Sequence, residues 1–217
     1  MSKPVRIWDI PTRLFHWVLV LLIVNSYVTQ WQSWMDLHIL SGEAILALLL
    51  FRVVWGVVGS DTARFGFFLK SPIAAFHHLL HLRKREPDTE IGHNAAGGWM
   101  VVGMLTLLFA QVGTGLFTAD DDALVEGPLR HLVSKETSDL LGMLHDKIFD
   151  AIKIVVILHI AAIVVDLVVK GHNLVRPMVI GTKDIAEPVT KPRFRSPVLA
   201  AVILVIAAAA VAALVRL

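Results

Sequence analysis

Five long runs of apolar residues alternate with polar segments along the chain. Each run reaches about 20 residues, the length that an α-helix needs to cross a hydrocarbon core of ~30 Å. Of the 217 residues, 56% are hydrophobic and 18% are charged, which is atypical of a soluble domain. The pattern therefore predicts an all-α integral membrane protein with transmembrane helices at Leu14–Trp31, Leu37–Val58, Gly97–Phe117, Leu144–Val169 and Pro197–Leu217.

The polar segments suggest how the chain is organised. Residues 1–182 hold four of the predicted helices, and we expect them to form one four-helix transmembrane domain. Residues 183–196 are polar and rich in proline, which indicates a linker, and residues 197–217 form a separate C-terminal transmembrane helix. Within the second loop, residues 71–82 (SPIAAFHHLLHL) have apolar positions at helical spacing, which predicts a helix lying along the membrane interface.

Basic residues are concentrated in alternate loops. Three precede the first predicted helix, five lie in the second loop and six in the fourth, whereas the third loop has only two. Loops rich in Lys and Arg stay in the cytoplasm, so we expect a cytoplasmic N-terminus, a cytoplasmic linker and an external C-terminus. The third loop, on the outside, carries the acidic residues Asp120, Asp121, Asp122, Glu126, Glu136 and Asp139. Asp120, Asp121, Asp122 and Glu126 would either steer a basic partner or simply belong to a solvated loop.

Cysteine is absent, while histidine occurs ten times. The lack of thiols excludes disulfides, thiolate metal sites, iron–sulfur clusters and covalently attached haem. Any redox cofactor must therefore be held by histidine or by another ligand without a thiol.

The predicted topology gives four histidines an expected depth in the membrane. His145 and His159 lie fourteen residues apart on one predicted helix, which separates them by ~21 Å and leaves them within ~40° of the same face. His38 matches His145 in depth near the outer surface, and His16 matches His159 near the inner surface. Each pair comes from two helices and so suits a planar macrocycle with one axial imidazole from each helix. The alternative for any single histidine is an interfacial or hydrogen-bonding role.

Two arginines extend this pattern. Arg52 follows His38 by fourteen residues, and Arg13 precedes His16 by about one helical turn. Each guanidinium would suit a haem propionate, or would simply extend to the inner membrane surface. Both interpretations remain open at this point.

Other ionisable groups are less specific. His77, His78 and His81 would form either a metal site or a solvated helix face. Asp150 and Lys153 lie inside a predicted span, where they would form a structural ion pair or take part in proton uptake.

Several motifs together resemble the bacterial cytochrome b561 family, which includes the b-type cytochrome subunits of nickel–iron hydrogenases. The likeness runs from Val5 to Lys183, and the fifth helix lies outside it. It is carried by WDIPTRLFHW, LHILSGEAILALLLFRVVWGVVGS, ARF, GHNAAGGWMV, TGLF and the LH…LH of the fourth helix. The resemblance implies a four-helix bundle with two non-covalent b haems as cofactors. Its ligands correspond to His16 and His159 for the inner haem and to His38 and His145 for the outer haem.

The main functional hypothesis follows from the resemblance and the histidine pairs together. It is a dihaem electron-transfer subunit of an oxidoreductase system in the bacterial inner membrane. The subunit would pass electrons between a quinone and a periplasmic partner, such as a c-type cytochrome or a hydrogenase. Membrane lipid is expected around it and nucleic acid is not.

Two other hypotheses belong to different classes. The first is a self-contained quinone oxidoreductase that couples electron transfer to proton uptake. The second is a non-redox transporter or metal-binding membrane protein that uses the same histidines.

Overall fold

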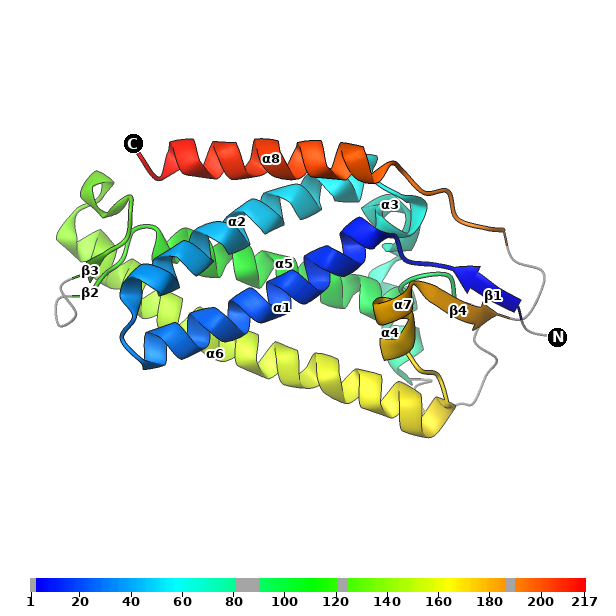
Figure 1. Cartoon of the computed structure of the whole chain (residues 1–217). Helices are drawn as coiled ribbons and strands as arrows, with labels where there is room; N and C mark the ends of the chain where they lie inside the picture. The colour runs from blue at the N-terminus through cyan, green and yellow to red at the C-terminus, as the bar shows by residue number, and fades with distance from the viewer. Residues whose placement is uncertain (1–2, 81–89, 121–124, 186–189) are drawn as a thin grey trace. The chain divides into compact units, whose positions relative to one another are not determined.

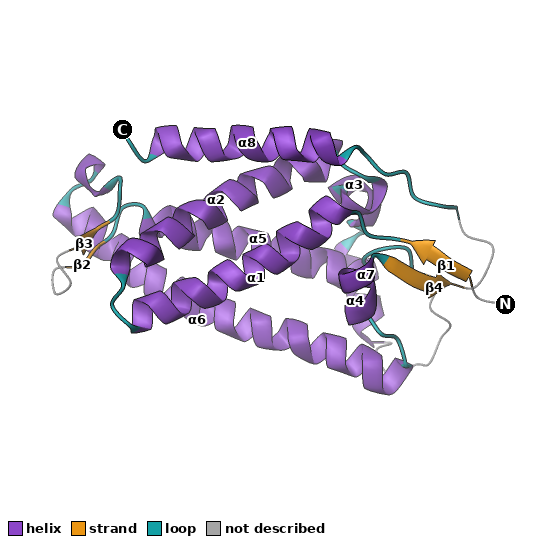
Figure 2. Cartoon of the chain, in the orientation of Figure 1, coloured by secondary structure: helices purple, strands orange, loops and turns teal. Residues whose placement is uncertain are grey.

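The computed structural model describes residues 3–80, 90–120, 125–185 and 190–217 (Figure 1). His81 belongs to the helix face for which a metal site is one of two interpretations, and Asp121 and Asp122 belong to the acidic loop. These three residues lie outside the described residues. Figure 2 shows that helices dominate the described chain, with two short pairs of strands.

Five helices in the described residues are long and apolar enough to cross a membrane. They are α1 (Ile10–Trp31), α2 (Met35–Val58), α5 (Ala95–Gly115), α6 (Lys135–Val165) and α8 (Pro197–Leu214). Each overlaps one of the predicted spans, so the expectation of an all-α, multi-pass membrane protein is confirmed.

Helix α6 is longer than the apolar pattern indicates. It begins at Lys135, nine residues before the predicted start at Leu144, because the polar segment KETSDLLGM is itself helical. The Ser134 hydroxyl accepts a hydrogen bond from the Thr137 backbone N–H at 3.3 Å, as an N-cap residue does. At its other end the helix continues into a π-helical turn, η3 (Asp166–Lys170), which Gly171 ends with a φ of 76°.

Short elements connect the long helices. They are the 3-10 turns η1 (Asp61–Ala63) and η2 (Arg130–Leu132), and the helices α3 (Phe65–Phe68), α4 (Pro72–Leu80) and α7 (Val175–Ile180). Helix α4 falls within the predicted interfacial segment and exposes Ile73, Phe76 and Leu80. Strand β1 (Lys3–Arg6) pairs antiparallel with β4 (Thr182–Ile185), and β2 (Ala119–Asp120) pairs with β3 (Val125–Glu126).

The chain divides into two compact units, each made of three segments. Unit 1 comprises Met1–Leu14, Val53–Gly103 and Val155–Ala200. Unit 2 comprises Phe15–Arg52, Met104–Ile154 and Ala201–Leu217.

Unit 1 contains the small sheet and the turns around it. Strands β1 and β4 lead into a buried cluster of Ile7, Trp8 and Ile185. Asp9, which is buried, accepts hydrogen bonds from the Thr12 backbone N–H at 2.7 Å and from Trp55 Nε1 at 3.1 Å. One side chain therefore caps the start of α1 and satisfies an indole in α2.

The segment expected as a linker makes specific contacts within unit 1. Residues 183–185 belong to β4, and the Lys183 ammonium donates to the Glu90 carbonyl at 3.1 Å. Nearer to α8, the Arg193 backbone N–H donates to Asp61 Oδ2 at 2.8 Å, and the Asp61 N–H donates to the Arg193 carbonyl at 3.0 Å. The described parts of the linker are thus held by hydrogen bonds.

Polar bonds between helices organise unit 2. The Asn25 side-chain amide in α1 donates to the Ser41 hydroxyl in α2 at 2.8 Å. Ser138 in α6 donates to the Phe117 carbonyl, just after α5, at 2.8 Å. Such bonds fix the register of helices whose apolar faces meet lipid.

Candidate functional site

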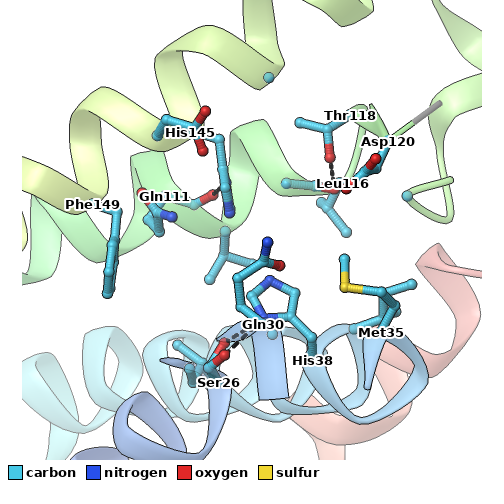
Figure 3. Close-up of a pocket in the computed structure, with 18 of the residues that line it drawn as sticks. Ser26, Gln30, Met35, His38, Gln111, Leu116, Thr118, Asp120, His145 and Phe149 are labelled. Carbon is cyan, nitrogen blue, oxygen red and sulfur yellow. Dashed lines mark hydrogen bonds between the residues drawn. The ribbon is translucent and has the colours of Figure 1, made fainter. Parts of the chain in front are cut away.

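Two imidazoles face each other in unit 2 (Figure 3). His38 extends from α2 and His145 from α6, and both rings are partly buried. Their centroids are 6.3 Å apart and their planes cross at 74°. The structure therefore brings these two histidines together within one compact unit.

Each ring is held at its Nδ1 atom by one backbone carbonyl and one side-chain hydroxyl. Nδ1 of His38 lies 2.9 Å from the Ser26 carbonyl oxygen and 3.2 Å from the Ser26 hydroxyl. Nδ1 of His145 lies 2.9 Å from the Gln111 carbonyl oxygen and 3.2 Å from the Thr114 hydroxyl. A carbonyl oxygen can only accept, so each Nδ1 carries the proton and each Nε2 keeps a lone pair. That tautomer is the one in which histidine binds a metal through Nε2.

The rings project into a cavity of about 940 Å³. Helices α1, α2, α5 and α6 all contribute to its wall. Its volume is at the upper end of the range of about 300–1,000 Å³ that small-molecule and cofactor sites occupy. The cavity is thus large enough for a macrocycle between the two rings.

The distance between the rings fits an intervening metal centre. Two imidazole–metal bonds of about 2 Å, together with the distance from each nitrogen to its ring centre, put the ring centres roughly 6 Å apart. The observed 6.3 Å agrees. Glycine at position 115 is also required, because a Cβ there would lie 2.8 Å from Cε1 of His145. The residues present therefore fit a haem with two axial histidines.

A comparison with known families matches residues 7–181 to the model of prokaryotic cytochrome b561. The chain belongs to this family. Comparisons with curated proteins and with solved structures find no match. Membership makes the protein a membrane b-type cytochrome that binds b-type haem and transfers electrons across the membrane.

The second predicted pair of this cytochrome is divided between the two units. His16 lies in α1 within unit 2, where its ring meets that of Trp17 edge-on at 4.8 Å. His159 lies in α6 within unit 1, fourteen residues after His145 on the same continuous helix. Both side chains are partly buried.

The two arginines occupy different environments. Arg52 lies in α2 and is 2% exposed, so a simple extension to the membrane surface does not describe it. Arg13 lies in α1 within unit 1, where its guanidinium donates to the carbonyl of Val179. Gly181 packs beside this arginine, since a Cβ there would lie 3.3 Å from the Arg13 Cζ.

The weaker candidates are only partly supported. Among the described residues no group of three or more His, Cys, Asp or Glu side chains could hold a metal ion, and the metal site suggested for α4 includes His81, which is not described. Asp150 and Lys153 do form an ion pair, with an N–O distance of 2.9 Å.

Sequence reasoning missed the groups that orient the imidazoles. Backbone carbonyls of Ser26 and Gln111 leave no mark on the sequence, because every residue has a carbonyl. The Thr114 hydroxyl and the close approach at Gly115 did have a signal. Thr114 and Gly115 are the first two residues of the TGLF motif, which is one of the motifs that this cytochrome shares with its family.

Proposed function

We propose that this cytochrome is a dihaem electron carrier. One b haem is bound between His38 and His145, and the second between His16 and His159. Electrons pass between a quinone in the membrane and a periplasmic redox partner, either a c-type cytochrome or a hydrogenase-like protein. The observation that carries the proposal is the His38–His145 pair, with ring centres 6.3 Å apart and both Nδ1 atoms bound to carbonyls.

The ligand arrangement selects outer-sphere electron transfer. His38 and His145 would together hold a b haem, which would supply one-electron redox chemistry and would have no open position for oxygen. The protein's task is then to hold the imidazoles still. The Ser26 and Gln111 carbonyls do this by fixing the orientation of each ring, which limits reorganisation when the charge on the iron changes.

The second haem site rests on the helix geometry of α6. Fourteen residues of α-helix span ~21 Å and return nearly to the same face, so His159 repeats the role of His145 at another depth. Arg52 follows His38 by the same spacing in α2, and it is buried. We assign Arg52 and Arg13 to the propionates of this second haem.

The uneven distribution of Lys and Arg among the loops supports one orientation of the protein in the membrane. The loops rich in Lys and Arg support a cytoplasmic N-terminus and a periplasmic C-terminus in a bacterial inner membrane. Residues 1–182 then form the dihaem domain, and α8 is an additional transmembrane helix.

Purified protein tests the proposal directly. Pyridine haemochrome analysis should find two b haems per chain, and both should be reduced by a quinol and reoxidised by a soluble c-type cytochrome. An absence of b haem would refute the proposal. A single haem that survives loss of His16 would refute the two-site assignment.

A periplasmic partner with a basic surface should respond to salt. The paired strands β2 and β3 carry Asp120 and Glu126. Surface charges of this kind raise association rates, and screening by salt lowers them. Electron exchange with a basic c-type cytochrome should slow several-fold between low salt and about 0.15 M. The variant Asp120→Asn/Glu126→Gln should show a smaller dependence, measured by stopped-flow absorbance. Reduction by an uncharged quinol is the control, and an unchanged exchange rate would exclude this docking surface.

A further inference from the structure

The wall of the His38–His145 cavity is strongly acidic. Its charged residues, among those that the structure describes, are one ammonium and four carboxylates: Lys153, Glu43, Asp120, Asp139 and Asp146. A b haem brings two propionates of its own into this cavity. Burying them against carboxylates alone would be unfavourable, so the position of the cation determines where a propionate can be placed.

Lys153 reaches the cavity from α6. It lies eight residues after His145, or ~12 Å along the helix. Its ammonium is 2.9 Å from Asp150 and 5.3 Å from the ring centre of Phe149, both of which precede it in the helix. Helical side chains point back toward the N-terminus, and these contacts show that Lys153 does so. The ammonium therefore lies closer to the level of His145 than its Cα does.

The acidic groups are distributed unevenly along α6. Asp139 precedes His145 by six residues and pairs with Lys135 at 3.6 Å, and Asp146 follows His145 directly. Asp120 belongs to β2, and Glu43 lies five residues after His38 on α2. Three of the four carboxylates thus come from β2 or from the part of α6 up to Asp146. Lys153 lies seven residues beyond Asp146, farther along the helix than either of the two α6 carboxylates that line the cavity.

Of the two members of the ion pair, one lines the cavity and the other does not. Lys153 lines the cavity, whereas Asp150, in the same described region, does not. The ammonium has three donors, and one of them meets Asp150. The remaining donors are available to an anion inside the cavity. Ionisable residues inside a transmembrane helix are costly and usually functional, and a bound carboxylate would give this pair a function.

We propose that Lys153 binds a propionate of the haem held by His38 and His145, and that Asp150 positions the ammonium. The inference rests on the proposed function, because it requires a haem in this cavity. It assigns a cationic partner to a propionate of this haem, for which the sequence analysis named no such partner. It also directs one propionate away from the carboxylates of Asp120, Asp139 and Asp146. Lys153 is accordingly a cofactor-binding residue and Asp150 is a positioning residue.

The test uses the full-length purified protein and the substitution Lys153→Gln. Without the ammonium, the haem should be lost on washing, so that the haem-to-protein ratio falls by up to half. The haem that remains in this site should titrate at a lower midpoint potential, because a nearby cation favours the reduced state. Lys153→Arg should restore both values. Lys147→Gln is the matched control, since Lys147 is exposed on the same helix and does not line the cavity.

Asp150→Asn separates propionate binding from a merely structural ion pair. If the pair is only structural, Asp150→Asn and Lys153→Gln remove the same interaction and should have the same effect. If Lys153 binds a propionate, Asp150→Asn should retain the haem and raise its midpoint potential, because a nearby negative charge is lost.

The outcomes separate this inference from the function on which it rests. Equal haem content and equal potential in Lys153→Gln and the wild type would overturn the role of Lys153 and leave the haem assignment intact. The same change in Asp150→Asn and Lys153→Gln would also overturn it. Wild-type protein without a haem between His38 and His145 would overturn both.

Discussion

His145→Gln and His38→Gln should each remove the same single haem from the purified cytochrome. The two rings lie 6.3 Å apart across one cavity, so each would provide half of the axial ligation of one iron. A non-covalent haem with one remaining axial ligand is held weakly, because no cysteine attaches it. Pyridine haemochrome analysis should give about half of the wild-type haem per chain, and redox titration should show one component fewer.

The double variant tests whether the two histidines act together. His38→Gln/His145→Gln should lose no more haem than either single variant, since each change already empties the site. His77→Gln, at an exposed position on α4, is the control and should retain the full haem content. Loss of both haems in the double variant, with one lost in each single variant, would assign His38 and His145 to different irons.

Gly115→Val should weaken the same haem without removing a ligand. A Cβ at position 115 would lie 2.8 Å from Cε1 of His145 and 3.2 Å from its Nδ1. The ring must then turn or shift, which breaks its 2.9 Å hydrogen bond to the Gln111 carbonyl. Loss of such an orienting contact typically lowers metal affinity by about 10–100-fold. Haem release to apomyoglobin, followed in the Soret band, should be faster in this variant by a factor of that order.

Gly113→Ala is the matched control for this effect. Gly113 lies two residues earlier on α5, and a Cβ there would meet nothing within 4 Å. Alanine in a helix is favoured over glycine by about 1 kcal/mol, so this variant should be as stable as the wild type or more so. If both glycine variants release haem at the wild-type rate, the contact between Gly115 and the imidazole has no role in haem binding.

The apolar pattern predicted the helices well and their ends less well. Each predicted span overlaps an observed helix, because burying backbone groups in lipid requires helical hydrogen bonding along the whole apolar run. The apolar pattern predicts a start at Leu144, whereas α6 begins at Lys135. Hydropathy identifies the apolar part of a helix that lies in the bilayer, and it does not identify a polar extension of the same helix. The segment KETSDLLGM is polar enough to leave the membrane and still helical. The strands β1 and β4 were missed for a related reason, since their pairing joins residues that are distant in sequence.

The sequence by itself predicts that four histidines fall into two depth-matched pairs. Helical periodicity indicates which face His145 and His159 share, and the alternation of charged loops predicts the orientation of the helices across the membrane. Both are one-dimensional properties. Neither reports how two helices approach each other.

Only the tertiary structure decided how the imidazoles are held and which charges surround them. The carbonyls of Ser26 and Gln111 become orienting groups because α1 and α5 bring them within 2.9 Å of the rings. Lys153 and Asp150 look equivalent in the sequence, yet only Lys153 lines the cavity. The reason is physical: a backbone carbonyl or an ion pair gains a specific role from its position in space, and packing between distant segments sets that position.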